Sequence, residues 1–412
     1  MSKVEELIKK MCPDGVEYKK LKEVTDFVQG FAFKNNTFKN EGIGLVRTTN
    51  IQDKSVSKEN MIYIDPKDYV ENLEKYIIRK DRILIGMSGT IKVGMNSSDE
   101  LFYLNQRVGM FIPNEKIINN KFLFYILDNS IPELYNLVSG SSVKNLSSNT
   151  LNDFRIPVPP LEVQCEIVHI LDDFTLLSAE LSAELKAREK QYQFYLNNLL
   201  DIEKLKPQKI MYVKDLFEIK NGLNKEKGAF GKGTPIVNFT DVYKNRYLTK
   251  NMLKGKVTLN EGEIKRYAVE KGDVFFTRTS ETKEDIGMSS TVIEDIEKCT
   301  FSGFVLRARP TTDLLIPKFC AYYFSTNKVR DTIIRYASFT TRATTSGPKL
   351  AKIPVPIISI KEQEKIVNIL DRFDKLCNDI SEGLPAEIEA RQKQYEYYRD
   401  KLLTFKELKV NE

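Results

Sequence analysis

The tetrapeptide IPVP at residues 156–159 recurs at residues 353–356. Two further pairs of segments follow in the same order: EIVHILD (166–172) with KIVNILD (365–371), and AREKQY (187–192) with ARQKQY (390–395). Fainter matches precede them: Gly30 with Gly222, VRTTNI (46–51) with VNFTDV (237–242), and residues 76–84 with 267–275. Blocks that recur in one order at nearly constant spacing indicate a tandem duplication.

The segments that follow the two IPVP copies have helical periodicity. Their apolar residues alternate spacings of three and four, the a/d pattern of a helix that packs on another helix. The predicted seam consists of Ile167, Ile170, Phe174, Leu177 and Leu181 in the first copy, and Ile366, Ile369, Phe373, Leu376 and Ile380 in the second. Pro within Gly383-Leu384-Pro385 predicts a break in the second helix. We expect the two helices to form an antiparallel pair; the alternative is that each covers only its own globular part.

Each half begins with a globular part of mixed α/β character. Residues 82–86 and 273–277 predict short buried strands, and residues 122–127 and 319–324 predict helices. The expected fold class is α+β: two similar α/β domains separated by two long helical regions that pair as an antiparallel coiled coil, with a pseudo-twofold internal repeat. The predicted boundaries are 1–157 and 207–354 for the globular domains, and 158–206 and 355–412 for the helical regions.

The positive charge is concentrated in the globular domains. The 412 residues include 63 Lys and Arg and 57 Asp and Glu, a net charge of +6. The first and second globular domains carry +2 and +10, whereas the helical regions carry −4 and −2. Binding phosphates requires Lys and Arg, so DNA contact is expected in the globular domains and protein contact on the helices. The alternative is that the charge serves solubility.

The composition also limits compartment and chemistry. The five cysteines form no C-x-x-C, and His169 is the single histidine, which speaks against zinc ribbons and multi-histidine metal sites. The N-terminus lacks the apolar stretch of a signal peptide, and no apolar run is long enough to cross a membrane. The expected location is the cytoplasm, with reduced thiols and no membrane contact.

Motifs of nucleotide or methyl chemistry are missing from the sequence. It contains no P-loop, no dinucleotide-binding G-x-G-x-x-G and no Asn-Pro-Pro-Tyr of an amino-methyltransferase. PDGVEYK at 13–19 contains the letters of a nuclease site, but its acids are too close together and Pro and Gly indicate a turn. His169 lies within the helical periodicity and is expected to be a structural or surface residue. The chain is therefore predicted to bind rather than catalyse, with no catalytic residue, cofactor or metal of its own.

The candidate binding residues are polar clusters at matched places in the two halves. Arg can read guanine and Asn or Gln adenine in the major groove, while Ser, Thr and Lys can hold phosphates. The candidates for DNA binding are Arg47, Thr48, Asn50, Ser88, Thr90, Asn105, Gln106, Arg107, Lys144 and Asn145 in the first half, and Asn238, Thr240, Arg278, Thr279, Ser280, Arg342, Thr344 and Ser346 in the second. Matched places that carry different side chains indicate one scaffold that recognises a different DNA sequence in each half. The alternative is that these are polar loops exposed to solvent without a binding role.

These features together resemble the specificity (S) subunit of type I restriction–modification systems, over the whole chain. The most characteristic stretches are IPVPPLEVQ at 156–164 running into 167–171, GLPAEIEAR at 383–391, and the opening CPDGV at 12–16. The second copy departs from the pattern, because IISIKEQ at 357–363 replaces the usual Pro-Leu-Glu. The start of the second helix is therefore expected to be shifted.

The resemblance implies a mechanism. Each globular domain would read one half of a bipartite, asymmetric DNA target, and the helices would set the spacing of the half-sites and dock two methyltransferase (M) subunits. The complex would recruit restriction (R) subunits; S-adenosylmethionine, ATP and Mg would bind only to partner subunits, and self-association would run through the helices. Two other hypotheses remain: a catalytic fusion, against which the missing motifs argue, and a decoy specificity protein that binds partner subunits without specifying methylation.

Overall fold

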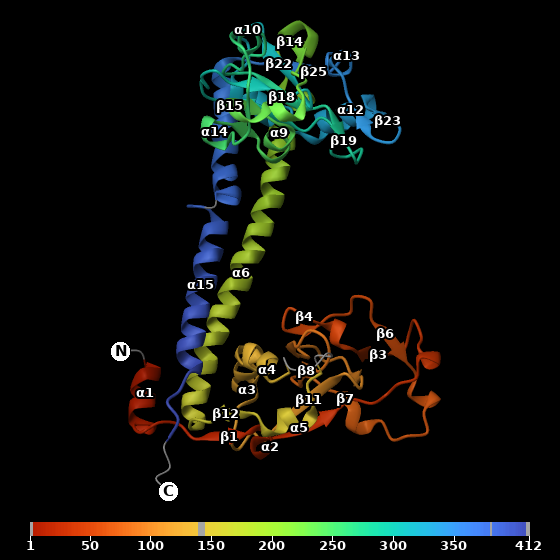
Figure 1. The fold of residues 1–412 in the computed structure, drawn as a ribbon, viewed down its shortest axis with the longest axis vertical. Coiled ribbons are helices and arrows are strands. Elements are labelled where there is room, and N and C mark those ends of the chain that lie inside the picture. Colours follow the sequence, from red (N-terminus) through yellow and green to blue (C-terminus); the bar gives the residue numbers. More distant parts are fainter. Residues whose placement is uncertain (1–2, 139–144, 380, 409–412) are drawn as a thin grey trace. The chain divides into compact units, whose positions relative to one another are not determined.

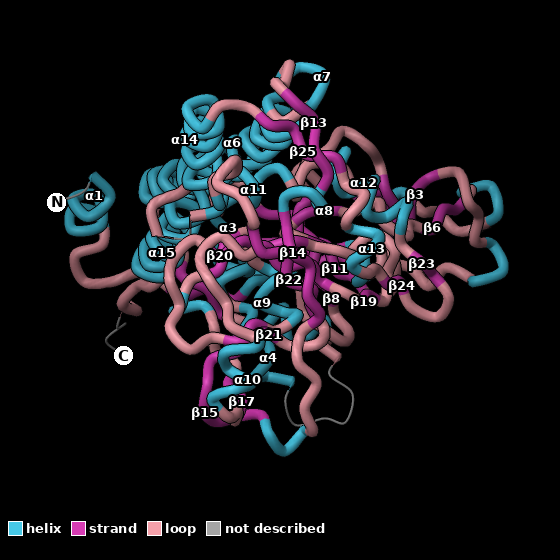
Figure 2. Tube along the Cα trace, turned by 90° about the horizontal axis from the view of Figure 1, so that it is seen from above, coloured by secondary structure: helices cyan, strands magenta, loops and turns pink. Residues whose placement is uncertain are grey.

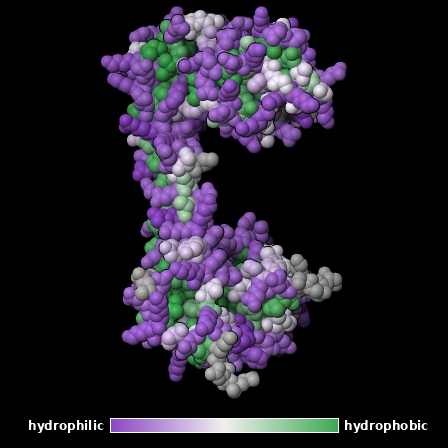
Figure 3. All heavy atoms as spheres, turned by 60° about the vertical axis from the view of Figure 1, so that its left-hand side comes forward, coloured by the Kyte–Doolittle hydropathy of each residue, from purple (hydrophilic) through white to green (hydrophobic). Residues whose placement is uncertain are grey.

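The computed structural model describes residues 3–138, 145–379 and 381–408. The chain forms two compact units: residues 1–180 with 388–412 make unit 1, and residues 181–387 make unit 2. In each unit, a globular part built on β-sheets is joined to helix segments from both halves of the chain (Figure 1). Hydrophilic side chains cover most of the visible surface (Figure 3).

Unit 1 is built on a mixed sheet with strand order β2-β11-β8-β9-β5-β4. These strands are β2 (Thr25–Gln29), β11 (Val108–Pro113), β8 (Ile83–Gly86), β9 (Val93–Met95), β5 (Ser55–Val56) and β4 (Ile51–Gln52). A second sheet contains β6 (Ile62–Ile64), β3 (Ile43–Val46), β10 (Phe102–Leu104) and β7 (Ile77–Ile78), and β1 (Tyr18–Lys20) pairs with β12 (Arg155–Pro157). The helices are α1 (Lys3–Met11), α2 (Leu21–Val24), α3 (Asn120–Asn129), α4 (Ile131–Val138) and α5 (Ser148–Asp153).

Unit 2 repeats this arrangement with strand order β14-β22-β18-β20-β16; β14 and β22 lie side by side in Figure 2. These strands are β14 (Phe217–Asn221), β22 (Val305–Pro310), β18 (Val274–Thr277), β20 (Ser289–Val292) and β16 (Tyr247–Leu248). The other strands are β17 (Lys256–Val257), β15 (Phe230–Val237), β21 (Thr300–Phe301), β19 (Thr279–Ser280), β24 (Ala343–Thr344), β23 (Ser338–Phe339), β13 (Lys209–Tyr212) and β25 (Pro354–Ile357). The helices are α7 (Ile202–Leu205), α8 (Val213–Leu216), α9 (Phe239–Lys244), α10 (Glu261–Arg266), α11 (Pro317–Tyr323), α12 (Asn327–Tyr336), α13 (Gly347–Leu350) and α14 (Ile360–Asn378).

The predicted strands and helices of the globular parts are confirmed. Strands β8 and β18 are buried at every residue, which explains why both read as short apolar runs without alternation. The faint match of Gly30 with Gly222 also has a structural reason. A Cβ on Gly30 would lie 2.1 Å from the carbonyl oxygen of Asn105, and one on Gly222 would lie 2.0 Å from that of Ser302. Both glycines are needed because another backbone segment passes too close for a side chain.

The long helices form as expected. Helix α6 spans Leu161–Leu199, and the second helical region consists of α14 and α15 (Leu384–Leu403). The predicted break falls at residues 379–383, where the Asp379 carboxylate accepts hydrogen bonds from the backbone N–H groups of Ser381 and Glu382. Pro385 itself lies in the first turn of α15, where a missing N–H costs nothing.

The start of the second helix is shifted, as expected: α14 begins at Ile360, seven residues after Ile353, whereas α6 begins at Leu161, five residues after Ile156. Ser359 caps α14 by accepting a hydrogen bond from the Glu362 N–H. As a result, Gln363 is the fourth residue of α14, just as Gln164 is the fourth residue of α6. A serine cap replaces the Pro-Leu-Glu start, and the helix and its glutamine move together by two residues relative to IPVP.

The buried face of the helices differs from the predicted seam. Ile369 and Leu376 are exposed, whereas Gln363, Val367, Leu370 and Cys377 of α14 are buried. In α6, Ile167 and Leu181 of the predicted seam are buried, but Leu171 is buried where Ile170 is only half-buried. The predicted seam residue Ile380 lies outside the described residues. The reason is that the first half of each helix also packs into the core of its own globular part, as the alternative interpretation proposed. That second contact turns the buried stripe away from the a/d seam.

One stacked aromatic pair joins the two helices within each unit. In unit 1, Phe174 of α6 stacks on Tyr398 of α15, with ring centroids 5.5 Å apart; in unit 2, Phe373 of α14 stacks on Tyr195 of α6 at 5.1 Å. Both pairs are antiparallel. In unit 1, Lys3 of α1 forms an ion pair with Glu166 near the start of α6. Glu5 of α1 forms another with Lys401 near the end of α15. The start of one long helix therefore lies beside the end of the other.

Removing one of these stacks should loosen the helix pair. We expect Phe373→Leu to lower the free energy of unfolding by about 1 kcal/mol, because leucine keeps the apolar contact but loses the ring–ring interaction. Urea denaturation followed by circular dichroism measures this change. Phe230→Leu, at an exposed position of β15, is the control; an equal effect of both substitutions would contradict a role for the stack.

Buried tyrosines join each helical region to its own globular part. In unit 2, Asp371 of α14 accepts hydrogen bonds from the hydroxyls of Tyr322 at 2.6 Å and Tyr247 at 3.2 Å, and pairs with Lys318 at 2.6 Å. Burial raises the pKa of Tyr322, Tyr247 and Tyr192 well above the usual value of tyrosine. The neutral phenol is therefore the form that the fold accommodates.

These shifts predict alkaline instability. The pKa of a phenol in the unfolded chain is about 10, below the raised folded-state pKa, so the unfolded state loses its protons first as pH rises. The stability that the buried phenols contribute is complete below about pH 10 and falls above it, by up to about 1.4 kcal/mol per pH unit for each tyrosine. Urea denaturation between pH 8 and pH 11 should show this slope, and Tyr322→Phe should reduce it. Tyr212→Phe, at an exposed tyrosine, should leave the slope unchanged.

Candidate nucleic-acid interface

In unit 2 the polar clusters meet at the end of β18. Strand β19 pairs antiparallel with β24, which places Thr279 opposite Thr344. The Arg278 N–H donates to the carbonyl oxygen of Phe304 at 3.0 Å, and the Arg278 carbonyl accepts from the Thr345 N–H at 3.0 Å. Three segments far apart in sequence are thus held together by backbone hydrogen bonds. Because the side chains take no part in these bonds, they can change without loss of the arrangement.

Two hollows flank the exposed ring of Phe304. The first, of about 450 Å³, is lined by Phe239, Tyr243, Thr279, Ser280, Glu281, Thr282, Asp285, Phe304 and Arg342. The second, of about 510 Å³, is lined by Asn224, Arg278, Thr279, Gly303, Phe304, Thr344, Thr345, Ser346 and Lys349. Phe304 is 65% exposed. Six of the eight candidates in this half therefore border one surface: Arg278, Thr279, Ser280, Arg342, Thr344 and Ser346.

Charge on this surface is mixed. The guanidinium of Arg342 is 67% exposed and lies 3.9 Å from the Glu281 carboxylate, a contact too long and too solvated to hold it. Arg278 donates to the carbonyl of Gly303 at 3.4 Å, so its side chain is partly engaged in the loop. Arg342 is thus the more available cation for a phosphate or a guanine edge.

Unit 1 has the same backbone frame with other side chains. The Met87 N–H donates to the carbonyl of Arg107 at 2.9 Å, and the Met87 carbonyl accepts from Leu146 N–H at 2.8 Å. Ser88 pairs with Asn145 in an isolated bridge. The Thr48 hydroxyl donates to the Arg107 carbonyl at 3.2 Å. The candidates Thr48, Ser88, Arg107 and Asn145 therefore converge as their counterparts do in unit 2.

Two other candidates, Asn50 and Asn238, are engaged within their own loops. Asn50 is fully buried, and its amide closes its own loop by donating to the carbonyls of Ser57 and Glu59. Asn238 precedes α9 and donates to the Ile236 carbonyl. This geometry fits support of the loops better than contact with a base. Thr90, Gln106 and Thr240 are exposed and Asn105 is half-buried. Lys144 lies outside the described residues.

Arg47 is held in its loop as well. Its guanidinium donates to the Asn60 carbonyl at 2.8 Å, and its backbone N–H donates to the Asn50 side chain at 3.2 Å. The exposed aromatic residues, by contrast, were missed by the sequence analysis. Phe304 lies two residues after Ser302, which meets Gly222 as Asn105 meets Gly30, and Tyr243 stacks on Phe239 with centroids 5.6 Å apart. For Phe304, the only signal in the sequence is its place just after Ser302 and Gly303. An aromatic residue is by default expected to be buried.

The described residues do not meet the requirements of a metal site or of a membrane-spanning helix. Within the described ranges, no group of three or more His, Cys, Asp and Glu side chains lies close enough together to hold a metal ion. Among the helices that the structure describes, none is both long and apolar enough to cross a membrane. His169 is exposed, with its ring 3.7 Å from the Asp173 carboxylate on the same helix.

The fold and the paired polar surfaces define a duplicated recognition protein, in which one backbone frame carries two different sets of side chains. Residues 13–188 and 206–390 each match the family profile of the type I restriction modification DNA specificity domain. The chain belongs to this family.

Relatives agree with this assignment. The chain is 32% identical over 305 residues to the type I restriction enzyme EcoR124I/EcoR124II specificity subunit of Escherichia coli, covering 69% of this chain and 70% of that protein. It is 29% identical over 363 residues to a putative type I restriction enzyme specificity subunit of Haemophilus influenzae, covering 84% and 88%.

Solved structures share the fold. The S subunit of the type I restriction–modification system from M. genitalium matches with a TM-score of 0.51 over 94% of this chain and 96% of that one, at 14% identity. A chain from a structural study of assembly and conformational transition of the type I system matches with a TM-score of 0.62, over 95% and 98%, also at 14% identity.

Proposed function

We propose that this chain specifies a bipartite, asymmetric DNA target, with one half read by the globular part of unit 1 and the other by that of unit 2. The observation that carries the proposal is the repeated frame with different side chains. Ser88 and Asn145 in unit 1 occupy the places of Thr279 and Thr344 in unit 2. One scaffold with two sets of polar groups suits two different half-sites.

The domain roles follow from this assignment. We propose residues 1–157 and 207–354 as the two readers, and residues 158–206 and 355–412 as the regions that set half-site spacing and dock methyltransferase subunits. The acidic helices support a protein partner, and the basic second reader supports DNA. Methyl transfer and cleavage would be carried out by partner subunits, which would bind S-adenosylmethionine, ATP and Mg. The complex would act on DNA in the cytoplasm.

Mapping of methylated adenines tests the proposal. The chain is co-expressed with a methyltransferase subunit of its own system, and modified adenines are located across the host genome by single-molecule sequencing. A split, asymmetric motif is expected. Exchange of residues 1–157 for the reader of another specificity subunit should change only one half of that motif. Absence of methylation from a stable purified complex would contradict the proposal and favour a decoy that binds partner subunits alone.

A further inference from the structure

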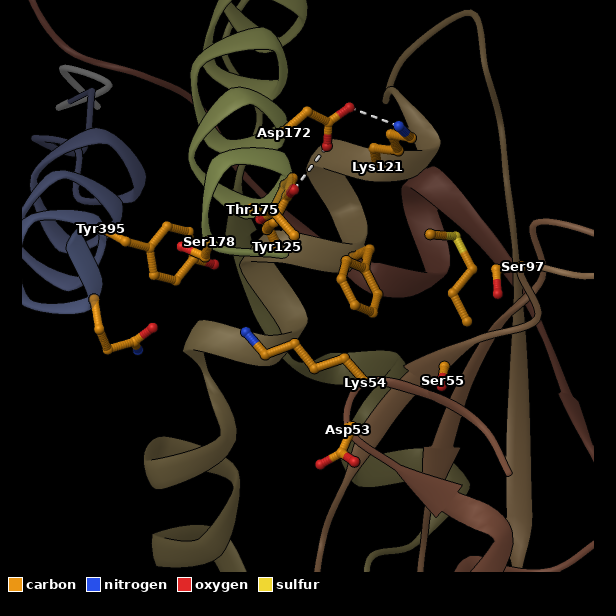
Figure 4. A pocket seen from close by; sticks show the side chains of 13 residues that line it. Asp53, Lys54, Ser55, Ser97, Lys121, Tyr125, Asp172, Thr175, Ser178 and Tyr395 are labelled. Carbon is orange, nitrogen blue, oxygen red and sulfur yellow. Dashed lines mark hydrogen bonds and ion pairs between the residues drawn. The ribbon is translucent and has the colours of Figure 1, made fainter. Parts of the chain in front are cut away.

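Unit 1 contains a pocket away from the candidate interface, where α3 and the β4–β5 turn face the helix pair. Its volume is about 420 Å³. It is lined by Asp53, Lys54, Ser55, Met95, Ser97, Lys121, Phe124, Tyr125, Asp172, Thr175, Ser178, Gln392 and Tyr395. Figure 4 shows Asp172, Lys121 and Tyr125 on one side of this pocket and Lys54 and Ser55 on the opposite side.

The polar side of the pocket is anchored by one carboxylate. Asp172 of α6 accepts a hydrogen bond from the Tyr125 hydroxyl at 2.7 Å and pairs with Lys121 at 2.6 Å. The opposite cation is also held in place: Lys54 pairs with Asp128 at 2.7 Å and lies 5.5 Å from the ring centroid of Tyr395. The space between these groups is bordered by the apolar side chains of Phe124 and Met95.

Unit 2 contains the same cluster, built from the matched residues. Asp371 pairs with Lys318 and accepts from Tyr322, both at 2.6 Å, as Asp172 does with Lys121 and Tyr125. Arg246 lies 5.2 Å from the ring centroid of Tyr192, as Lys54 lies over Tyr395. The two junctions are therefore directly comparable, residue by residue.

The linings differ at several positions, Phe124 with Ala321 and Thr175 with Asp374 among them, and the difference that concerns an aromatic ring lies at Ser55. In unit 2 the Thr291 N–H donates to the Arg246 carbonyl and Thr291 is the register partner of Tyr247; in unit 1 the Met95 N–H donates to the Lys54 carbonyl and Met95 is the partner of Ser55. Ser55 thus occupies the place of Tyr247.

The side chains at this shared position behave differently. Tyr247 places its ring edge-on to Tyr322, with centroids 5.9 Å apart, and its hydroxyl donates to Asp371 at 3.2 Å. Ser55 donates to the carbonyl of Gln52 in its own turn and brings no ring. Unit 2 therefore supplies from its own chain a phenol that unit 1 lacks.

We propose that the unit 1 pocket binds a phenol ring, whose hydroxyl donates a hydrogen bond to Asp172 and whose ring packs among Phe124, Tyr125 and Met95. The carboxylate has accepting capacity beyond its present partners, since Asp371 accepts from two tyrosines and a lysine at once. The phenol would come either from a free small molecule or from a tyrosine side chain of another polypeptide.

Methionine methyl groups report on this site directly. The full chain is labelled with 13C at the methionine methyls and titrated with p-cresol, the side-chain analogue of tyrosine, and in parallel with toluene. p-Cresol is expected to shift the Met95 signal by its ring current and to bind about tenfold more tightly than toluene, because only p-cresol donates to a charged acceptor. Met252 and Met288 of unit 2 should not shift. No Met95 shift with p-cresol, or equal affinities for the two compounds, would overturn the proposal.

Two variants separate a specific site from general apolar binding. Ser55→Tyr, which places a ring in the pocket, should abolish the Met95 shift while the melting temperature is kept or raised. Tyr247→Ser, which copies unit 1 in unit 2, should lower the melting temperature, and p-cresol should restore it more than toluene does. Unchanged p-cresol binding in Ser55→Tyr, or no rescue of Tyr247→Ser, would contradict the equivalence on which the proposal rests.

A third titration identifies the source of the ring. N-acetyltyrosine amide carries the phenol on a peptide backbone. Binding as tight as that of p-cresol would support a tyrosine presented by another polypeptide. Binding at least tenfold weaker than that of p-cresol would support a free phenol.

Discussion

Replacement of Gln363 by leucine is expected to lower the free energy of unfolding by about 3–5 kcal/mol, since three backbone groups lose their partners. Gln363 is fully buried at the start of α14. Its amide donates to the carbonyls of Leu314 at 2.7 Å and Ile358 at 3.0 Å, and its side-chain oxygen accepts from the Ile316 N–H at 3.0 Å. One side chain therefore ties the helix to the segment before α11. Leucine fills the space but satisfies none of these groups.

Chemical denaturation measures the loss, and hydrogen exchange localises it. The Ile316 amide should exchange faster in Gln363→Leu than in the unmodified chain, because its acceptor is gone. Gln164→Leu should have the same effect in unit 1, where that glutamine bonds Asn119 N–H and the carbonyls of Ile117 and Pro159. Gln193→Leu, at an exposed position of α6, is the control and should change stability little. A change below 1 kcal/mol in Gln363→Leu would contradict the assigned role.

The double variant Arg278→Ala/Arg342→Ala is expected to reduce DNA affinity by about 50- to 100-fold in the complex with methyltransferase subunits. Both guanidinium groups border the hollows around Phe304. Loss of a cation that contacts phosphate weakens binding and reduces the dependence of log affinity on log salt by about one for each contact. Fluorescence anisotropy between 50 and 300 mM salt gives both quantities, and the slope should fall by about two.

A charge-matched control separates contact from general electrostatics. Lys361→Ala/Lys365→Ala removes two exposed charges from α14 and should change affinity only slightly. If both double variants weaken binding equally, the surface around Phe304 is not the reader. If the arginine variant loses affinity but the salt slope stays unchanged, its guanidinium groups act by shaping the loop rather than by meeting phosphate.

The duplication, the long helices, the break between α14 and α15, and the buried strands β8 and β18 could all be predicted from the amino-acid sequence. These features depend on local periodicity, on caps and on uninterrupted apolar runs, all of which act between residues close in the chain. The sequence predicted that Ser88, Asn145, Thr279 and Thr344 lie in polar loops at matched places of the two halves. It did not predict that Ser88 pairs with Asn145, or Thr279 with Thr344.

The buried faces of the helices and the exposure of individual loop residues could not be predicted from the sequence, because they depend on packing between distant segments. The buried stripe of α14 runs through Val367 and Leu370 rather than Ile369, because the helix packs on a globular part as well as on α6. Asn50 is buried in its loop while Phe304 is exposed, the reverse of what polarity alone predicts. Both outcomes depend on strand pairings between residues far apart in sequence, and periodicity carries no information about such pairings.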